Sequence, residues 1–320
     1  MKKFLKIVAF SVIALLVLVL GYAALNYHAD IAVDDLKAKY TNTESEFMDL
    51  DGMKVHYRDE GNPSDSIPLV LIHGTSSSLH TWDAWVQDLL PSHRIIRLDM
   101  PAFGLTGPNP QQDYSLDYYA HFLHEFLGKL SVKHIYLAGN SLGGSIAWHY
   151  ALAYPNEVNK LILIDAGGYR SKGKLSGGAA GFKIAQNPIL SKLMKVITPK
   201  SLVEKSLLDT YGDDTKVNDA LVQRYFDMLL RTGNRTALVK RMTSMNFGES
   251  TQIKNINTPT LIIWGDLDQL IPVEHAELFH QDLPNDTLVI FKGVGHVPME
   301  EAPAATAKAV KDFLKTNLKP

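Results

Sequence analysis

Three side chains that lie far apart in the sequence have the types that acyl transfer needs: Ser141, Asp268 and His296. A serine hydroxyl is a weak nucleophile at neutral pH, so a base must remove its proton as it attacks. An imidazole can act as that base, and a carboxylate can hold the ring in the required tautomer. The local sequence around each residue indicates whether a fold can bring them together.

The residues around Ser141 predict a nucleophile turn. Residues 139–143 read Gly-Asn-Ser-Leu-Gly and fit the pattern G-x-S-x-G, after an apolar run and before a helical pattern. A sharp strand-to-helix turn exposes the serine oxygen, and the flanking glycines let neighbouring backbones pass closely. The first N–H groups of the helix would point at a developing oxyanion. The alternative is a glycine-rich turn with a passive serine.

Among the histidines that follow Ser141, His296 has the sequence context of a catalytic base. It lies in residues 293–298, Gly-Val-Gly-His-Val-Pro, between the last predicted strand and the last predicted helix. Glycines before the histidine and a proline after it indicate a loop that holds the ring in one place. The other histidines fall within helical patterns and are predicted to pack or to face solvent: His149, His275 and His280.

Three aspartates could orient the imidazole. Asp266 and Asp268 both follow the strand predicted at residues 260–264. Asp268 lies where the turn has ended and the chain can face the site, whereas Asp266 is better placed to cap the turn. We predict Asp268 as the triad acid. Asp165, at the end of the preceding strand, is a third candidate, since related layouts sometimes place the acid there.

An early His-Gly turn can complete the oxyanion hole. Residues 73–78 read HGTSSS and follow a predicted strand. The backbone N–H of Thr75 would then face the substrate carbonyl together with that of Leu142. We predict that His73 braces this loop and is not the base.

Short apolar runs and helical patterns alternate along most of the chain. Strands that are apolar throughout are typical of a parallel sheet buried on both faces. The order predicts an α/β fold with a doubly wound, mostly parallel sheet. The strands are predicted at residues 54–58, 69–72, 94–98, 134–138, 161–164, 260–264 and 287–291. The helices are predicted at residues 82–90, 116–130, 142–154, 273–280 and 304–318.

One long stretch interrupts the alternation. From about residue 167 to residue 258 no strand pattern occurs, and amphipathic helical patterns follow a Gly/Lys-rich opening. Because sheet strands resume afterwards, we expect an inserted helical cap and not an independent domain. The predicted domains are an anchor or signal at 1–27, a stalk at 28–46, an α/β core at 47–166 and 259–320, and the cap at 167–258.

The N-terminus predicts a membrane anchor. Lys2, Lys3 and Lys6 precede an almost wholly apolar run from Ile7 to Leu25. About 20 helical residues cover a hydrocarbon core of about 30 Å, and a signal-peptide core is usually shorter. The leading lysines predict a single-pass protein with its N-terminus in the cytoplasm and its catalytic domain on the opposite, extracytoplasmic side. Residues 21–23 could also be a cleavage site, so secretion after cleavage stays an alternative.

Composition excludes several other classes. The hydrophobic fraction of 46% and the charged fraction of 21% are ordinary for a globular protein. A net charge of −2 gives no electrostatic footprint for nucleic acid. The absence of cysteine removes thiol nucleophiles, disulfides and cysteine-based zinc sites. No H-E-x-x-H, Walker or dinucleotide motif occurs, so we expect no metal and no cofactor, and the oligomeric state stays open.

The ordered set of motifs resembles the α/β-hydrolase fold superfamily over roughly residues 47–318. The resemblance implies Ser141, Asp268 and His296 as nucleophile, acid and base, with Thr75 and Leu142 as oxyanion donors. Many members have glycine where this chain has Ala102, in a turn near the pocket. The motifs are HGTSSS (73–78), DMPAFGLTG (99–107), GNSLGG (139–144), WGDLDQLIP (264–272) and GVGHVPMEEAP (293–303).

The sequence therefore predicts a serine hydrolase of the carboxylesterase or lipase class. Its partner would be a small acyl ester, lipophilic or of medium chain length, with monoacylglycerol as one example. A rival is a carbon–carbon bond hydrolase that acts on ring-fission products. Such an enzyme needs cations for a substrate carboxylate, and the arginines of the cap are candidates. A third alternative is a binding protein that keeps the fold without turnover.

Overall fold

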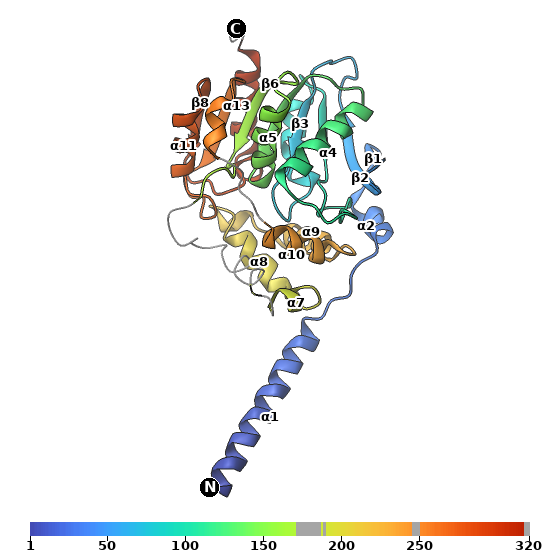
Figure 1. The fold of residues 1–320 in the computed structure, drawn as a ribbon, viewed down its shortest axis with the longest axis vertical. Coiled ribbons are helices and arrows are strands. Elements are labelled where there is room, and N and C mark those ends of the chain that lie inside the picture. Colours follow the sequence, from blue (N-terminus) through green and yellow to red (C-terminus); the bar gives the residue numbers. More distant parts are fainter. Residues whose placement is uncertain (171–186, 188–189, 245–249, 317–320) are drawn as a thin grey trace.

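An eight-stranded sheet forms the centre of the computed structural model, which describes residues 1–170, 187, 190–244 and 250–316 (Figure 1). The strand order is β1-β2-β4-β3-β5-β6-β7-β8, and every pair from β4 to β8 is parallel. The predicted doubly wound, mostly parallel sheet is therefore confirmed. The strands are β1 (Ser45–Leu50), β2 (Met53–Glu60), β3 (Leu69–Ile72), β4 (Ile95–Leu98), β5 (Ile135–Asn140), β6 (Val158–Ile164), β7 (Thr260–Gly265) and β8 (Asp286–Phe291).

Helices cover both faces of the sheet, which explains why the central strands are apolar throughout. Every residue of β3, β4 and β7 is buried. Successive side chains of a strand point to opposite faces, so Val70 packs on one side and Leu71 on the other. Burying one such side chain contributes about 1.5–3 kcal/mol. The helices of the first face are α4 (Leu116–Lys129), α5 (Leu142–Ala153) and α11 (Glu274–Asp282); those of the second are α3 (Asp83–Leu89), α12 (Pro298–Glu301) and α13 (Pro303–Lys315).

Two elements of the core differ from the prediction. The strand β1 crosses the predicted boundary between the stalk, which ends at residue 46, and the core, where no strand is predicted before residue 54; it pairs antiparallel with β2 at the edge of the sheet. An edge strand is half solvated, and only Leu50 of β1 is fully buried, so the apolar signal is weak. The short helix α12 also has no counterpart in the prediction, because four residues are too few for a periodic pattern.

Helices fill the described part of the predicted cap, between β6 and β7 in the chain. In Figure 1 they lie between the sheet and the N-terminal helix. Most of the Gly/Lys-rich opening, residues 171–182, lies outside the described residues, and the cap limits 167 and 258 stay predictions. The cap helices are α7 (Leu190–Met194), α8 (Lys200–Leu208), α9 (Asp219–Leu230) and α10 (Asn234–Thr243), with 3₁₀ turns η2 (Asp214–Lys216) and η3 (Ser250–Asn255).

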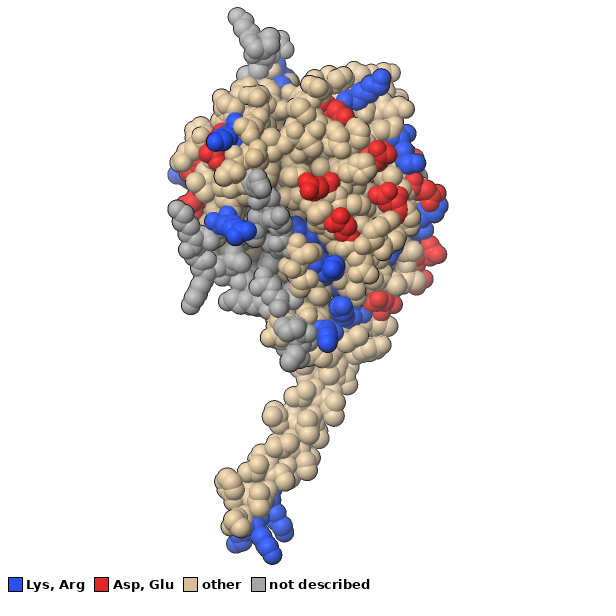
Figure 2. All heavy atoms as spheres, in the orientation of Figure 1, with Lys and Arg blue, Asp and Glu red and all other residues tan. Residues whose placement is uncertain are grey.

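The N-terminal helix α1 (Lys2–Leu25) projects away from the rest of the molecule (Figure 1). By length and composition it is able to cross a membrane, and none of its residues is buried. Basic side chains mark its far end (Figure 2), which agrees with the position of the lysines in the sequence. The helix α2 (Val33–Tyr40) lies within the predicted stalk.

The segment after α1 is bound to the cap. The carbonyl of Asn26 accepts a hydrogen bond from Thr198 N at 3.1 Å. Asp30 forms an ion pair with Arg235 at 2.5 Å, and the Arg235 side chain is almost completely buried. The cap is therefore bound to the chain only a few residues after the apolar helix ends.

Candidate active site

The loops that carry the predicted site follow β5, β6, β7 and β8, at the carboxyl edge of the sheet. Parallel neighbours end at the same edge, so four sequence segments meet there. In open α/β sheets this edge is where ligands bind. The side chains supplied by the four loops are Ser141, Asp165, Asp268 and His296.

Ser141 occupies the strained turn that the sequence predicts. Its φ angle is +56°, a backbone conformation that residues other than glycine rarely adopt. A Cβ atom on Gly139 would lie 2.1 Å from the Gly143 carbonyl oxygen, and one on Gly143 would lie 2.1 Å from the Ile72 oxygen. Only glycine fits at these two positions, because the backbones touch. The strain and the close packing together are the features of a nucleophile turn.

His296 and Asp268 form a buried pair. His296 Nδ1 donates to Asp268 Oδ2 at 2.7 Å, and both side chains are almost inaccessible. The other carboxylate oxygen, Oδ1, accepts from the backbone N–H groups of Leu270 at 2.7 Å and Ile271 at 2.9 Å. Three donors therefore hold one carboxylate in place. The pairing leaves Nε2 of the ring as the nitrogen that can accept a proton.

Asn140, the residue before Ser141, joins the serine loop to the histidine loop. Its side-chain amide donates to the His296 carbonyl at 2.9 Å and to the Ile164 carbonyl at 3.2 Å. This hydrogen bond holds the residue before Ser141 against the backbone of His296. Asp268 joins these loops through its hydrogen bond to His296.

The loop of residues 73–75 lies against Ser141. A Cβ atom on Gly74 would lie 3.1 Å from Ser141 Cβ, so Thr75 follows directly at the site. Leu142 is the first residue of α5, and the first N–H groups of a helix have no partner within it. The two residues whose backbone amides are predicted to form the oxyanion hole therefore lie next to Ser141 in the chain or next to the loop that contacts it.

His73 braces this loop. Its Nδ1 donates to the Gly74 carbonyl at 2.7 Å, and its Nε2 accepts from Met100 N at 3.0 Å. Burial lowers the pKa of His73, which keeps the ring neutral and its Nε2 able to accept. These contacts agree with the predicted bracing role.

The alternative acids and bases have other partners. Asp266 Oδ1 accepts from Gly293 N at 2.7 Å, so this side chain holds a turn as expected. His149 pairs with Asp117 at 2.6 Å, and His280 pairs with Asp286 at 2.8 Å. Asp165 is the exception, because it lies near the triad: one ligand atom from each of Asp165, Asp268 and His296 lies within 4.8 Å of the others.

The sequence did not predict the contact between the cap and the histidine loop. His296 N donates to the carbonyl of Thr210 in the cap at 2.8 Å. Glu301 accepts from Gly295 N at 2.7 Å with one oxygen and from Gly212 N at 2.9 Å with the other. A buried carboxylate therefore connects the cap to the loop that carries the base. Two adjacent glutamates shortly after the histidine were the available signal.

A second set of the same residue types lies elsewhere in the core. His56 Nδ1 contacts Asp99 Oδ2 at 2.7 Å, and its Nε2 contacts Ser45 Oγ at 3.2 Å. Asp99 also accepts from Leu79 N at 2.7 Å and Leu105 N at 2.8 Å. Burial alone would raise the pKa of Asp99, but the charge and hydrogen bond of His56 lower it well below its usual range.

The turn next to Asp99 contains the departure noted in the sequence. Ala102 has a φ angle of +86°, in the left-handed region that favours glycine. This explains why glycine is common there in the family that the motifs resemble. Ala102 packs in the core, and its N–H donates to the Gly107 carbonyl at 2.7 Å.

Comparisons with known proteins agree with the fold and the motifs. Residues 69–309 match the profile of the alpha/beta hydrolase family. The chain belongs to that family. It is 30% identical over 277 residues to Lipase 3 of a Moraxella species, a match that covers 82% of this chain and 83% of the relative. It is 28% identical over 272 residues to a human monoacylglycerol lipase, covering 81% of this chain and 78% of that one.

A solved structure covers almost the whole hydrolase, including α1. It is that of a bacterial membrane phospholipase A, with a TM-score of 0.73 and 26% identity. The superposition covers 98% of each chain. The resemblance to α/β hydrolases in the sequence is therefore confirmed.

Proposed function

We propose that this hydrolase is a serine esterase that cleaves lipophilic or medium-chain acyl esters, monoacylglycerols among them. The observation that carries the proposal is the 2.7 Å hydrogen bond between His296 Nδ1 and Asp268 Oδ2, beside the strained turn of Ser141. Relatives named as lipases support esters as the class of substrate. The predicted residues Ser141, Asp268 and His296 take the roles of nucleophile, orienting acid and base.

The reaction would proceed by acyl transfer. His296 Nε2 takes the hydroxyl proton of Ser141 as the oxygen attacks the ester carbonyl. The backbone N–H groups of Thr75 and Leu142 stabilise the oxyanion of the tetrahedral intermediate. The imidazolium then gives its proton to the leaving alcohol, and a water molecule hydrolyses the acyl-enzyme by the same route. Asp268 stays ionised throughout and stabilises the imidazolium.

The attachment of α1 to the cap supports a lipophilic substrate. A helix that can cross a membrane ends within a few residues of the contacts between Asn26, Asp30 and the cap. The enzyme would thus work next to the bilayer, where acyl chains are concentrated. Following the lysines before α1, we propose that the N-terminus is cytoplasmic and the catalytic domain extracytoplasmic.

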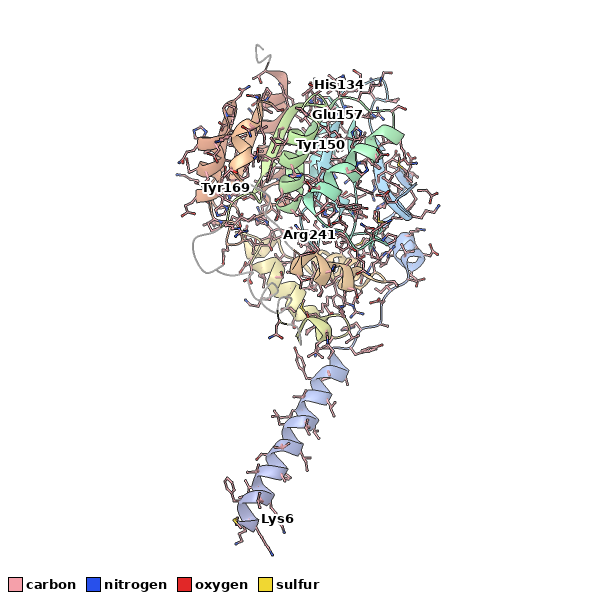
Figure 3. The ribbon with its side chains drawn as sticks, viewed as in Figure 1. Lys6, His134, Tyr150, Glu157, Tyr169 and Arg241 are labelled. Carbon is pink, nitrogen blue, oxygen red and sulfur yellow. The ribbon has the colours of Figure 1, made fainter. Side chains whose placement is uncertain are left out.

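The partners of the cap arginines weigh against the carbon–carbon hydrolase. Arg235 is paired with Asp30, and Arg231 donates to the Leu105 carbonyl at 3.3 Å. Arg241 lies where α10 meets the core (Figure 3) and is buried against Tyr119. Each of these three guanidinium groups already has a partner within the protein, while Nε of Arg231 and of Arg241 is buried without a hydrogen-bond partner among the described residues.

A panel of p-nitrophenyl esters of graded chain length, run beside one ring-fission product, tests the substrate class. We expect turnover of the esters to rise with acyl length and no turnover of the dienoate. Activity on the dienoate alone would establish the carbon–carbon hydrolase instead. A fluorophosphonate probe should label the wild type and not Ser141→Ala, and an unlabelled wild type would indicate a binding protein.

Protease treatment of sealed cells tests the location. We expect the catalytic domain to be cut from the outside and α1 to remain with the membrane after an alkaline wash. A soluble protein that begins after residue 23 would show instead that the N-terminal segment is a cleaved signal.

A further inference from the structure

Asp165 is a buried carboxyl group for which the proposed mechanism has no use. It follows β6, has no exposed surface and adopts a φ angle of +44°. Its backbone N–H donates to the Ile263 carbonyl at 3.0 Å, and its Oδ1 accepts from Gly265 N at 3.1 Å. The second oxygen, Oδ2, is buried and has no hydrogen-bond donor in the part of the chain that the structure describes. Backbone strain, burial and a missing donor each cost folding free energy, so we expect this carboxyl group to have a role.

The two carboxyl groups at this edge are unequal in their surroundings. Asp268 receives two backbone N–H groups and the ring N–H of His296, whereas Asp165 receives one N–H. An oxygen of each lies within 4.8 Å of the other, and both residues are buried. Two buried carboxylates this close cannot both be ionised without a large repulsion. The proton belongs on the group with fewer donors.

We propose that Asp165 is a neutral carboxylic acid that donates a hydrogen bond to the Asp268 carboxylate, and so is a positioning residue of the triad. The proposal rests on the proposed function, because it concerns the same site. The O–H of Asp165 supplies a further donor to Asp268, which fixes the carboxylate against His296. The same hydrogen bond weakens the attraction between Asp268 and the imidazolium of His296, because a carboxylate that accepts a further hydrogen bond interacts less strongly with the ring.

The groups around Asp165 point the same way. The titratable groups that face it, among the residues described, are Asp268 after β7, His296 after β8 and Glu301 of α12. Burial, and after it the charge of Asp268, raises the pKa of Asp165 well above its ordinary value. A hydrogen bond to Asp268 and the charge of Glu301 add to the effect, and the Gly265 N–H opposes it.

The variant Asp165→Asn tests whether the Asp165 side chain is neutral or charged in the wild type. The amide keeps an acceptor for Gly265 N and a donor for Asp268, so we expect kcat/KM within about threefold of the wild type. The acid limb of the pH–rate profile should stay in place. If Asp165 is ionised instead, the substitution removes a negative charge beside His296, and the acid limb moves to lower pH by about one unit. That shift would overturn the proposal.

Asp165→Ala is the matched variant that removes the donor. With one donor fewer, the Asp268 carboxylate binds the imidazolium more tightly, and the acid limb should move to higher pH by about half a unit. The asparagine variant restores the wild-type position. Equal profiles for the alanine and asparagine variants would show that Asp165 has only a packing role.

A measurement of stability tests the proton on Asp165 without any substrate. A group whose folded pKa is raised makes the folded state less stable as the pH rises above its unfolded pKa of about 3.9. The melting temperature of Asp165→Asn should therefore exceed that of the wild type at about pH 8, by a margin that shrinks towards about pH 4. A margin that does not change with pH contradicts the proposal even if the protein has no esterase activity.

A divalent cation held between the two carboxylates is the remaining way to relieve their repulsion. A chelator would then lower the melting temperature of the wild type and spare Asp165→Asn, which would overturn the proposal. We expect no effect of the chelator on either protein. Loss of all ester turnover with the expected stability profile would instead reject the proposed function alone.

Discussion

Two regions of this molecule hold a serine, a histidine and an aspartate, and in both the histidine Nδ1 lies 2.7 Å from the aspartate Oδ2. Ser45, His56 and Asp99 lie in hydrogen-bond contact at one edge of the sheet. Ser141 and the pair of His296 and Asp268 lie at the carboxyl ends of the central strands. We propose catalysis only for the second set.

The difference lies in the backbone around each serine. Ser45 begins a regular strand, and its oxygen accepts from Asn42 N at 3.2 Å and from Arg58 Nε at 3.1 Å. Ser141 stands in a strained turn at the start of α5, with unpaired helix N–H groups next to it. The first serine therefore connects neighbouring elements, whereas the second stands next to the residues that we propose as oxyanion donors.

The strongest way to break this comparison is to remove each serine in turn. Ser141→Ala should lower kcat by about 10⁵–10⁶-fold, because acyl transfer loses its nucleophile. Ser45→Ala is the matched control and should leave kcat within about twofold, since it removes only hydrogen bonds at the edge of the sheet, with Asn42, His56 and Arg58. Hydrolysis of a p-nitrophenyl ester measures both. A large loss of kcat in Ser45→Ala would show that the nucleophile role has been assigned to the wrong serine.

The two aspartates extend the test. Asp268→Asn should lower kcat by about 10⁴-fold, because the imidazole loses the carboxylate that sets its tautomer. The variant should fold, since the amide replaces an isosteric group. Circular dichroism and kcat, compared with the wild type, check both statements. Near-normal turnover would show that another acid, with Asp165 as the first suspect, orients His296.

The link from the cap sharpens the comparison, because His296 N donates to a carbonyl of the cap, whereas His56 N donates to Thr106 of the core at 3.0 Å. Glu301→Gln keeps one acceptor of the buried bridge but weakens its hold on Gly295 and Gly212. We expect kcat to fall about tenfold with little change in KM, as for a base that is less well positioned. An equal effect on KM, or none on kcat, would show that Glu301 acts on substrate binding or on stability alone.

The smallest expected effect on turnover comes from Asp99→Asn. Its lowered folded pKa means that it stabilises the fold above its unfolded pKa of about 3.9 and ceases to do so as the pH falls below that value. The variant should lose about 2–4 kcal/mol of stability at neutral pH, and its unfolding free energy should depend less on pH below about pH 4. Chemical denaturation measures this, and kcat per folded molecule should not change.

Much of the fold was predictable from local patterns. The strand–helix alternation and the G-x-S-x-G turn depend on neighbouring residues, and the structure has β3 at residues 69–72 as predicted. The half-solvated strand β1 and the four-residue helix α12 were missed, because their apolar or periodic signal is too short.

The sequence by itself determined which side chains could do chemistry at this edge: a serine in a glycine-framed turn, a histidine in a rigid loop and aspartates after two strands. Only the tertiary structure decided what surrounds each of them. It paired His296 with Asp268, gave Asp266 to a turn and left Asp165 with one donor. The reason is that burial and hydrogen-bond partners set the charge of a carboxyl group, and both come from residues distant in the chain.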